Sequence, residues 1–208
     1  MSRPIDTALM IDGRLEAIVT AVPEQAASDV LLVCHPHPLH QGTMHNKVVT
    51  TLARMARDLG MPVLRFNFRG VMGSHGVWDE GLGEIDDALA ALAWMREQYP
   101  TARIHLAGFS FGAYVAAHAA SRSNVAGLML VAPATSRFDM ASVQVQVPTF
   151  VAFNWDDDTV EPASMSQWLS AQPELLVTAY LQTEGGHFYH GQLTALKRAA
   201  QDWLKGQI

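Results

Sequence analysis

The chain has 208 residues, which is enough for one domain with a substantial buried core. Its 14 basic side chains are scattered and are outnumbered by 20 acidic ones, which argues against a nucleic-acid surface. No apolar run reaches the ~18–20 residues of a membrane span, and the first residues lack the apolar core of a signal peptide. The single cysteine, Cys34, excludes an internal disulfide and is typical of a cytoplasmic protein. We therefore expect one cytoplasmic domain, residues 1–208, with no nucleic-acid or membrane partner.

Apolar runs that are typical of strands alternate with helical patterns along most of the chain. The predicted strands cover residues 14–20, 30–34, 63–66, 103–107, 125–131, 148–155 and 175–181. The predicted helices cover residues 46–59, 84–99, 111–120, 164–171 and 191–204, and a glycine-rich loop covers 69–83. This alternation predicts an α/β fold with a mostly parallel sheet and helices on both faces. Ligands of such sheets bind beyond the carboxyl ends of the strands.

The segment Gly108-Phe-Ser110-Phe-Gly112 fits the pattern G-x-S-x-G between a predicted strand and a predicted helix. In this context the pattern indicates a sharp turn that exposes a nucleophilic serine. A serine needs a base, which is usually histidine, and a carboxylate that orients the histidine. We therefore take Ser110 as the candidate nucleophile and look for its partners further along the chain.

Two histidines follow the serine, and His187 is preferred over His190. His187 comes after two glycines and a predicted strand, which suits a tight turn that aims its side chain over the sheet. The carboxylate candidates are the adjacent Asp156, Asp157 and Asp158, with Asp139 and Glu161 as weaker alternatives. Composition and spacing do not choose among the three adjacent residues.

Several motifs together resemble the α/β-hydrolase superfamily. They are His35-Pro-His-Pro38 with Gly42-Thr-Met44, Arg65-Phe-Asn-Phe-Arg-Gly70, the serine motif, and Gly186-His-Phe188. The chain is most similar to small bacterial hydrolases without a lid, which are related to dienelactone hydrolase and to the KANL3/Tex30-type hydrolase-like domain. The resemblance implies an α/β-hydrolase fold without a cap domain, and the short connection 132–147 agrees with the missing cap.

The resemblance also suggests the remaining site residues. In this group the acid precedes a valine and a proline, so Asp158, four residues before Pro162, matches best. Trp155 stands where the relatives have glycine, which keeps Asp157 as the second choice. The oxyanion hole is expected to use the backbone N–H of Phe111 and one from the loop after residues 30–34. Pro36 and Pro38 have no N–H, which leaves His37 or Leu39, and the resemblance to the His-Gly-x loop of the relatives favours His37.

We therefore expect the protein to be a serine hydrolase that cleaves carboxylic esters or thioesters through an acyl-enzyme, with a small-molecule ester as its substrate. The alternative is a hydrolase-like binding or scaffold domain without turnover. We expect no cofactor, since no nucleotide-binding motif is present. We expect no metal, since the histidines at 35, 37, 40 and 45 have no carboxylate or thiolate near them at ligand spacing except Cys34. The sequence leaves the natural substrate and a homodimeric state open.

Overall fold

The computed structural model describes residues 4–21 and 27–208, in which eight strands form one sheet. Residues 1–3 lie outside the described residues, and they include part of the segment from which we expect no signal peptide. The strands are β1 (Ile5–Ile11), β2 (Leu15–Ala21), β3 (Asp29–Cys34), β4 (Val63–Phe66), β5 (Arg103–Phe109), β6 (Gly127–Val131), β7 (Thr149–Asn154) and β8 (Val177–Gln182). Their order is β1-β2-β4-β3-β5-β6-β7-β8. Only the β1–β2 and β2–β4 pairings are antiparallel, which confirms the expected mostly parallel sheet.

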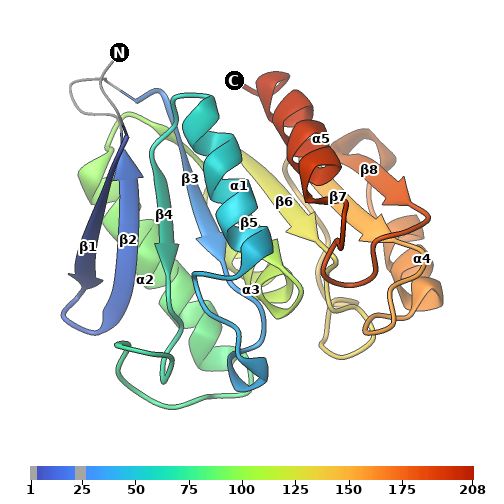
Figure 1. Ribbon diagram of the computed structural model, residues 1–208, viewed down its shortest axis with the longest axis horizontal. Helices are drawn as coiled ribbons and strands as arrows, with labels where there is room; N and C mark the ends of the chain where they lie inside the picture. Colours follow the sequence, from blue (N-terminus) through green and yellow to red (C-terminus); the bar gives the residue numbers. More distant parts are fainter. Residues whose placement is uncertain (1–3, 22–26) are drawn as a thin grey trace.

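Helices cover both faces of the sheet, as predicted (Figure 1). They are α1 (Lys47–Asp58), α2 (Leu82–Gln98), α3 (Phe111–Ser121), α4 (Pro162–Ser170) and α5 (Leu193–Lys205), together with the short turns η1 (Pro38–His40) and η2 (Glu174–Leu176). Helices α1 and α5 lie on one face, in front of the sheet in Figure 1, while α2 and α3 lie behind it. None of the helices within residues 4–21 and 27–208 is long and apolar enough to cross a membrane.

The central strands contribute side chains to two separate cores, because successive side chains of a strand point to opposite faces of the sheet. In β3, Leu31 and Val33 pack into the core under α1 and α5. Their neighbours Leu32 and Cys34 pack into the core under α2 and α3. All of these side chains are fully buried, which explains why the strand appears in the sequence as an unbroken apolar run.

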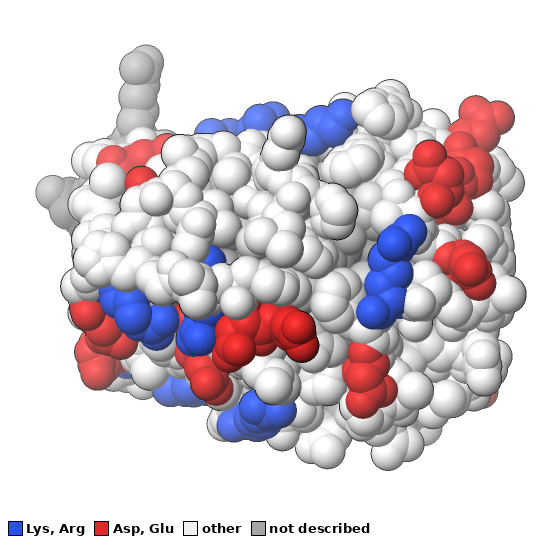
Figure 2. Space-filling model, turned by 90° about the horizontal axis from the view of Figure 1, so that it is seen from below, with Lys and Arg blue, Asp and Glu red and all other residues white. Residues whose placement is uncertain are grey.

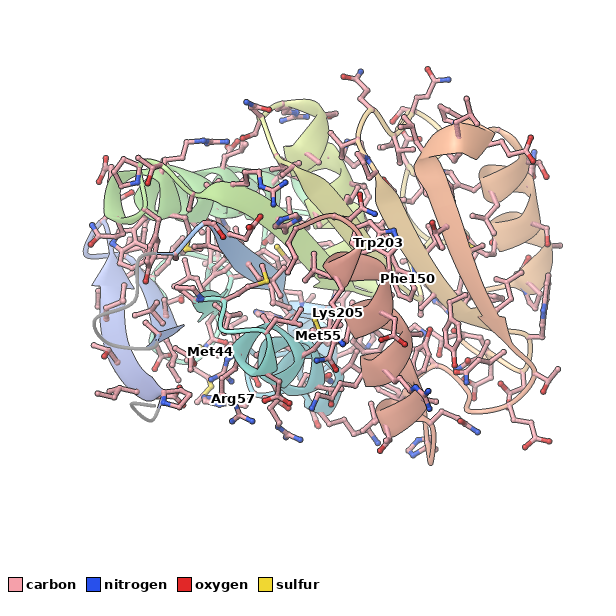
Figure 3. The ribbon with its side chains drawn as sticks, turned by 90° about the horizontal axis from the view of Figure 1, so that it is seen from above. Met44, Met55, Arg57, Phe150, Trp203 and Lys205 are labelled. Atoms are coloured by element: carbon pink, nitrogen blue, oxygen red, sulfur yellow. The ribbon has the colours of Figure 1, made fainter. Side chains whose placement is uncertain are left out.

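Helix α5 is attached to the sheet by aromatic packing. The ring centroids of Trp203 in α5 and Phe150 in β7 lie 5.8 Å apart, and both side chains can be followed in Figure 3. The predicted apolar face of this helix is confirmed by Leu196, Ala200 and Leu204, which are fully buried. This packing fixes the end of the chain against the strands that carry two of the candidate site loops.

The sequence did not predict β1. Its side chains are mostly exposed, so it lacks the buried apolar pattern that marks the other strands. A local signal was present, because the hairpin from β1 to β2 turns at Asp12-Gly13, and both residues have positive φ. The β1–β2 hairpin extends the sheet at the edge remote from β7 and β8.

The loops at the carboxyl ends of the parallel strands lie together at the lower edge of the sheet in Figure 1. Three of them follow β5, β7 and β8, and they carry Ser110, the Asp156–Asp158 run and His187. The connection from β6 to β7, residues 132–148, contains neither a helix nor a strand. Within the described chain, no cap therefore covers this edge, in agreement with the expectation.

Candidate active site

Ser110 occupies a strained turn between β5 and α3. Its φ of 56° and ψ of −118° lie outside the regions that residues with side chains commonly adopt. The Ser110 N–H donates to the Val131 carbonyl at 2.8 Å, and the Ser110 carbonyl accepts from Ala113 N–H at 2.9 Å. The turn is thus held by β6 on one side and by the first turn of α3 on the other. This confirms the local geometry that the G-x-S-x-G pattern predicts.

The two glycines of the motif are required by close backbone contacts. A Cβ atom at Gly108 would lie 2.0 Å from the Gly112 carbonyl oxygen. A Cβ atom at Gly112 would lie 2.4 Å from the carbonyl oxygens of both Cys34 and His35. Such distances are far below van der Waals contact, so each position admits only hydrogen. The turn therefore packs directly against the end of β3.

His187 connects Ser110 to a carboxylate. The His187 Nε2 atom lies 2.9 Å from Ser110 Oγ, and Nδ1 lies 2.8 Å from Asp157 Oδ2. A carboxylate only accepts hydrogen bonds, so Nδ1 carries the proton and Nε2 is free to accept from the serine hydroxyl. His187 is only 4% exposed, and its ring packs against the rings of Phe109 and Phe188. The histidine preferred from the sequence is therefore the one that meets the serine.

The expectation that Asp158 pairs with His187 is wrong in this structure, because Asp157 occupies that position. Asp157 is buried, and its Oδ1 accepts from the N–H groups of Thr159 and Val160, both at 2.8 Å. Asp158 is exposed, and within residues 4–21 and 27–208 its carboxylate accepts only from the Thr159 hydroxyl, at 3.2 Å. The tight turn after β7 starts with a bond from Asp157 N–H to the Asn154 carbonyl, and this turn aims Asp157 inward.

Asp156 has a role that sequence reasoning missed. Its two carboxylate oxygens accept from the N–H groups of Gly185 and Gly186, at 3.0 and 2.9 Å. The Asn154 side chain donates to the Gly186 carbonyl at 2.7 Å. These bonds join the loop after β7 to the loop that carries His187. No signal in the sequence pairs these two loops, which are about thirty residues apart.

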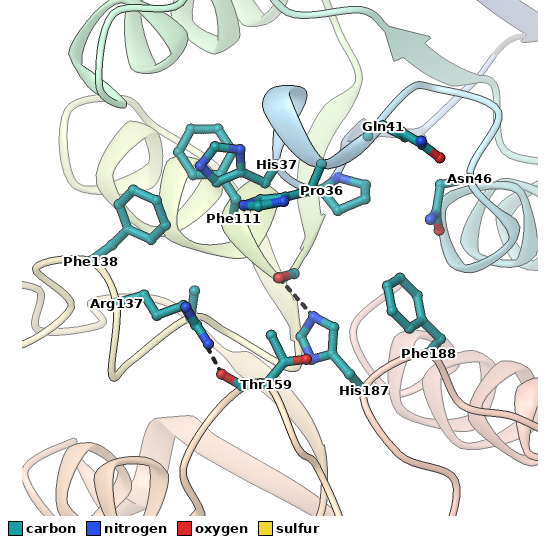
Figure 4. Close-up of a pocket in the computed structure, with 14 residues that line it drawn as sticks. Pro36, His37, Gln41, Asn46, Phe111, Arg137, Phe138, Thr159, His187 and Phe188 are labelled. Atoms are coloured by element: carbon teal, nitrogen blue, oxygen red, sulfur yellow. Dashed lines mark hydrogen bonds between the residues drawn. The ribbon is translucent and has the colours of Figure 1, made fainter.

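The loop after β3 lies across the cavity from His187 (Figure 4). It is held by His35, whose Nε2 accepts from Phe68 N–H at 3.0 Å and whose Nδ1 donates to the Pro36 carbonyl at 2.6 Å. Burial lowers the pKa of His35 from 6.5 to about 4, so this ring is neutral. A Cβ atom at Gly42 would lie 2.0 Å from the Pro36 carbonyl oxygen, so this glycine also closes the loop.

His37 and Phe111 present backbone N–H groups beside Ser110. Phe111 is the first residue of α3, whose first N–H groups have no acceptor within the helix. In the described part of the chain, neither the His37 N–H nor the Phe111 N–H donates a hydrogen bond. The His37 ring accepts from Leu39 N–H at 3.2 Å and packs 5.2 Å from the ring of Phe111. A free backbone N–H group can donate a hydrogen bond to an oxygen atom that develops negative charge.

A cavity of about 450 Å³ lies over Ser110 and His187. Figure 2 looks onto this edge of the molecule and shows wide uncharged areas between separated acidic and basic groups. Phe111, Phe138 and His37 form an aromatic wall on one side, with ring centroids 5.0 to 5.8 Å apart. Phe188 lies on the opposite side, and Arg137 faces the Ser110–His187 pair (Figure 4).

The remaining histidines and Cys34 do not form a shared site. His35 is buried, His37 and His40 line the cavity, and His45 is exposed. Across residues 4–21 and 27–208, no three histidine, cysteine, aspartate or glutamate side chains gather in a way that could hold a metal ion. Cys34 is fully buried at the end of β3, and burial raises its thiol pKa far above the usual range. Cys34 is therefore a packing residue of the core.

Comparisons with known proteins extend over nearly the whole chain. The sequence pattern described as the alpha/beta hydrolase fold matches residues 30–203. An uncharacterized protein of Rickettsia prowazekii is 33% identical over 204 residues, which are 93% of this chain and 85% of that protein. A solved serine hydrolase without a lid from Xanthomonas campestris is 38% identical, with a TM-score of 0.88 over 99% of this chain and 96% of its own. A serine hydrolase homologue from Coxiella burnetii is 36% identical, with a TM-score of 0.87 over 97% of both chains.

Proposed function

Because the chain belongs to the α/β-hydrolase family, we propose that it is a serine hydrolase that cleaves carboxylic esters or thioesters through an acyl-enzyme. The observation that carries this proposal is the continuous hydrogen-bonded series from Ser110 through His187 to Asp157. In such a series the serine is the nucleophile, the histidine is the base and the carboxylate orients the histidine. The open cavity above Ser110 gives a substrate access to the hydroxyl.

In the first half of the reaction, Ser110 Oγ attacks the carbonyl carbon of the ester while its proton passes to His187 Nε2. The carbonyl oxygen becomes an oxyanion, which the N–H groups of Phe111 and His37 stabilise. The tetrahedral intermediate then expels the alcohol or thiol, which takes the proton from His187. The acyl group is left on Ser110.

In the second half, His187 removes a proton from water, and the hydroxide oxygen attacks the acyl carbon. The second tetrahedral intermediate collapses, releases the carboxylic acid and returns the proton to Ser110. Asp157 stays ionised throughout, keeps the proton of His187 on Nδ1 and stabilises the transient imidazolium. The bonds from Thr159 and Val160 N–H groups hold Asp157 in place for this role.

The direct test is covalent labelling with a fluorophosphonate, combined with a panel of short-chain nitrophenyl esters. The probe should attach to Ser110 and abolish hydrolysis, and Ser110→Ala should remove both labelling and turnover. The loss of kcat is expected to be on the order of 10⁴–10⁶-fold. A folded protein that neither reacts with the probe nor hydrolyses any ester, thioester or lactone would instead be a binding or scaffold domain.

A further inference from the structure

Arg137 stands out in the cavity because it is a cation without an acidic partner among the described residues. It comes from the β6–β7 connection, next to Phe138, and faces the cavity beside Ser110 and His187 (Figure 4). Among the described residues that line the cavity, it is the only lysine or arginine, and none is aspartate or glutamate. No described carboxylate lies within 4 Å of its guanidinium, in contrast to Arg69, which is paired with Asp87 at 2.9 Å.

The guanidinium is oriented although it is unpaired. Its Nε donates to the Thr159 carbonyl at 3.0 Å, whereas its two terminal nitrogens donate to no described residue. Thr159 itself is fixed, because its N–H donates to Asp157 Oδ1 at 2.8 Å. Two terminal N–H₂ groups in one plane therefore stay available, and this fork matches the two oxygens of a carboxylate.

The carboxylate of Asp157, which accepts from Thr159 N–H, does not compensate this charge. Asp157 directs one oxygen to His187 and the other to two backbone N–H groups, so its acceptors are in use. The protein as a whole has a formal charge of −6, so a cation in the substrate cavity is a local exception. Beside it, the partly exposed ring of Phe138, which packs 5.0 Å from the buried ring of Phe111, offers aromatic surface for an uncharged part of the same molecule.

We propose that Arg137 determines substrate specificity by binding a carboxylate, so that the preferred substrates are esters that carry a second, ionised carboxyl group. The inference rests on the proposed ester hydrolysis and adds the charge of the substrate to it. Arg137 takes no part in bond making. It orients the ester over Ser110 through two charge-assisted hydrogen bonds, and the aromatic wall contacts the remainder of the molecule.

The test compares matched ester pairs that differ by one methyl group and one charge. Monomethyl adipate and dimethyl adipate place the charge on the acyl side, while 4-acetoxybenzoate and its methyl ester place it on the leaving group. Each is measured at neutral pH with the unaltered protein, Arg137→Met, Arg137→Lys and Arg122→Met. Arg122 follows α3 at the end remote from Ser110, so Arg122→Met removes the same charge away from the cavity.

We expect kcat/KM to favour the charged member of at least one pair by about tenfold, the usual effect of a charged hydrogen bond. Arg137→Met should abolish this preference, so that the charged and the neutral member of each pair react with equal kcat/KM. Arg137→Lys should retain part of the preference, and Arg122→Met all of it. High salt should weaken the preference, because exposed charges are screened. Equal ratios in the unaltered protein and in Arg137→Met would overturn the proposal.

A binding measurement separates this proposal from the proposed function. In Ser110→Ala protein, calorimetry with the same esters needs no turnover. Tighter binding of the charged ester that is lost in the Ser110→Ala, Arg137→Met double variant supports the carboxylate site even if the protein hydrolyses nothing. Ester hydrolysis with equal binding of charged and neutral members would overturn the carboxylate site and leave the hydrolase assignment intact.

Discussion

His187 Nδ1 lies 2.8 Å from Asp157 Oδ2, and both side chains are almost completely buried. The adjacent Asp158 projects outward, although the spacing to Pro162 favoured it. The turn after β7 therefore decides which aspartate pairs with His187, because it sets the direction of each side chain. The spacing to Pro162 in the sequence does not decide it. This relationship provides the sharpest test of the site.

Replacing Asp157 by Asn should cripple catalysis while Asp158→Asn should not. An amide at position 157 can donate to Nδ1, which favours the tautomer whose Nε2 cannot accept the serine proton. By analogy with other triads, kcat should fall about 10⁴-fold for Asp157→Asn and by less than about twofold for the exposed Asp158→Asn. Steady-state hydrolysis of a nitrophenyl ester measures both. A larger loss for Asp158→Asn would mean that the loop turns differently.

Asp156 should act as a positioning residue for the His187 loop. Asp156→Ala removes both acceptors for the N–H groups of Gly185 and Gly186, so the imidazole loses its alignment with Ser110. We expect kcat to fall by about tenfold to a hundredfold, because small displacements of reacting groups are costly. Asp156→Asn keeps one acceptor and should be intermediate. Asp158→Ala is the matched control, and equal kcat values for it and Asp156→Ala would contradict the prediction.

Gly112→Ala should destabilise the fold as well as remove activity. Its Cβ atom would lie 2.4 Å from two backbone carbonyl oxygens, which cannot move without displacing β3 from α3. The free energy of unfolding should fall by more than about 2 kcal/mol, which urea denaturation measures. At Gly206, with a φ of −76°, a Cβ atom would lie 3.3 Å from the Trp203 carbonyl. Gly206→Ala should therefore change stability by less than about 1 kcal/mol.

The stability of the protein should fall as the pH is lowered from about 6.5 to 4. His35 is buried and neutral, with its pKa lowered by burial from 6.5 to about 4, so in this range the unfolded chain binds a proton that the folded chain does not. Linkage then makes the folded state less stable with each step toward acid, by a total of about 3 kcal/mol. The stabilisation is complete above pH 6.5.

The control for this pH effect is His35→Gln, which keeps an acceptor for Phe68 N–H but cannot titrate. Urea unfolding at pH 7.5 and pH 4.5 measures the loss of stability in each protein. The loss should be smaller in the variant by about 2 to 3 kcal/mol, because the contributions of all other groups cancel in the comparison. An identical loss in both proteins would show that His35 is not the group responsible.

The uncovered cavity should favour esters of short acids. With no helix or strand in residues 132–147 to enclose a long acyl chain, remote apolar groups gain little binding energy. We expect kcat/KM for acetyl and butyryl nitrophenyl esters to exceed that for the dodecanoyl ester. Activity should also rise smoothly as the substrate passes its solubility limit. A strong preference for long chains would contradict an open site.

Local interactions explain what the sequence could predict. Strand β4 has the predicted bounds, and α1 is one residue shorter at each end than predicted. Asn46 caps its start, with a side chain that accepts from Val48 N–H, and Leu59 caps its end. The tight turn at Ser110 also follows from a near neighbour, since a Cβ atom at Gly108 would lie 2.0 Å from the carbonyl oxygen of Gly112, four positions away. Apolar periodicity, caps and close backbone contacts are all short-range properties that a sequence records.

Tertiary structure decided how the loops meet. Asp156 bonds to Gly185 and Gly186 because β7 and β8 are adjacent and parallel, so that their carboxyl ends meet at one edge. Arg137 likewise reaches the cavity through its contact with Thr159 in another loop. The choice of Asp157 over Asp158 depends on the turn after β7, in which the side chain of Asp157 is buried and that of the next residue, Asp158, is exposed. The sequence therefore determined which residue types each loop carries. The packing of distant loops decided which of these residues face Ser110, because the direction of a side chain in a loop depends on hydrogen bonds to partners elsewhere in the chain.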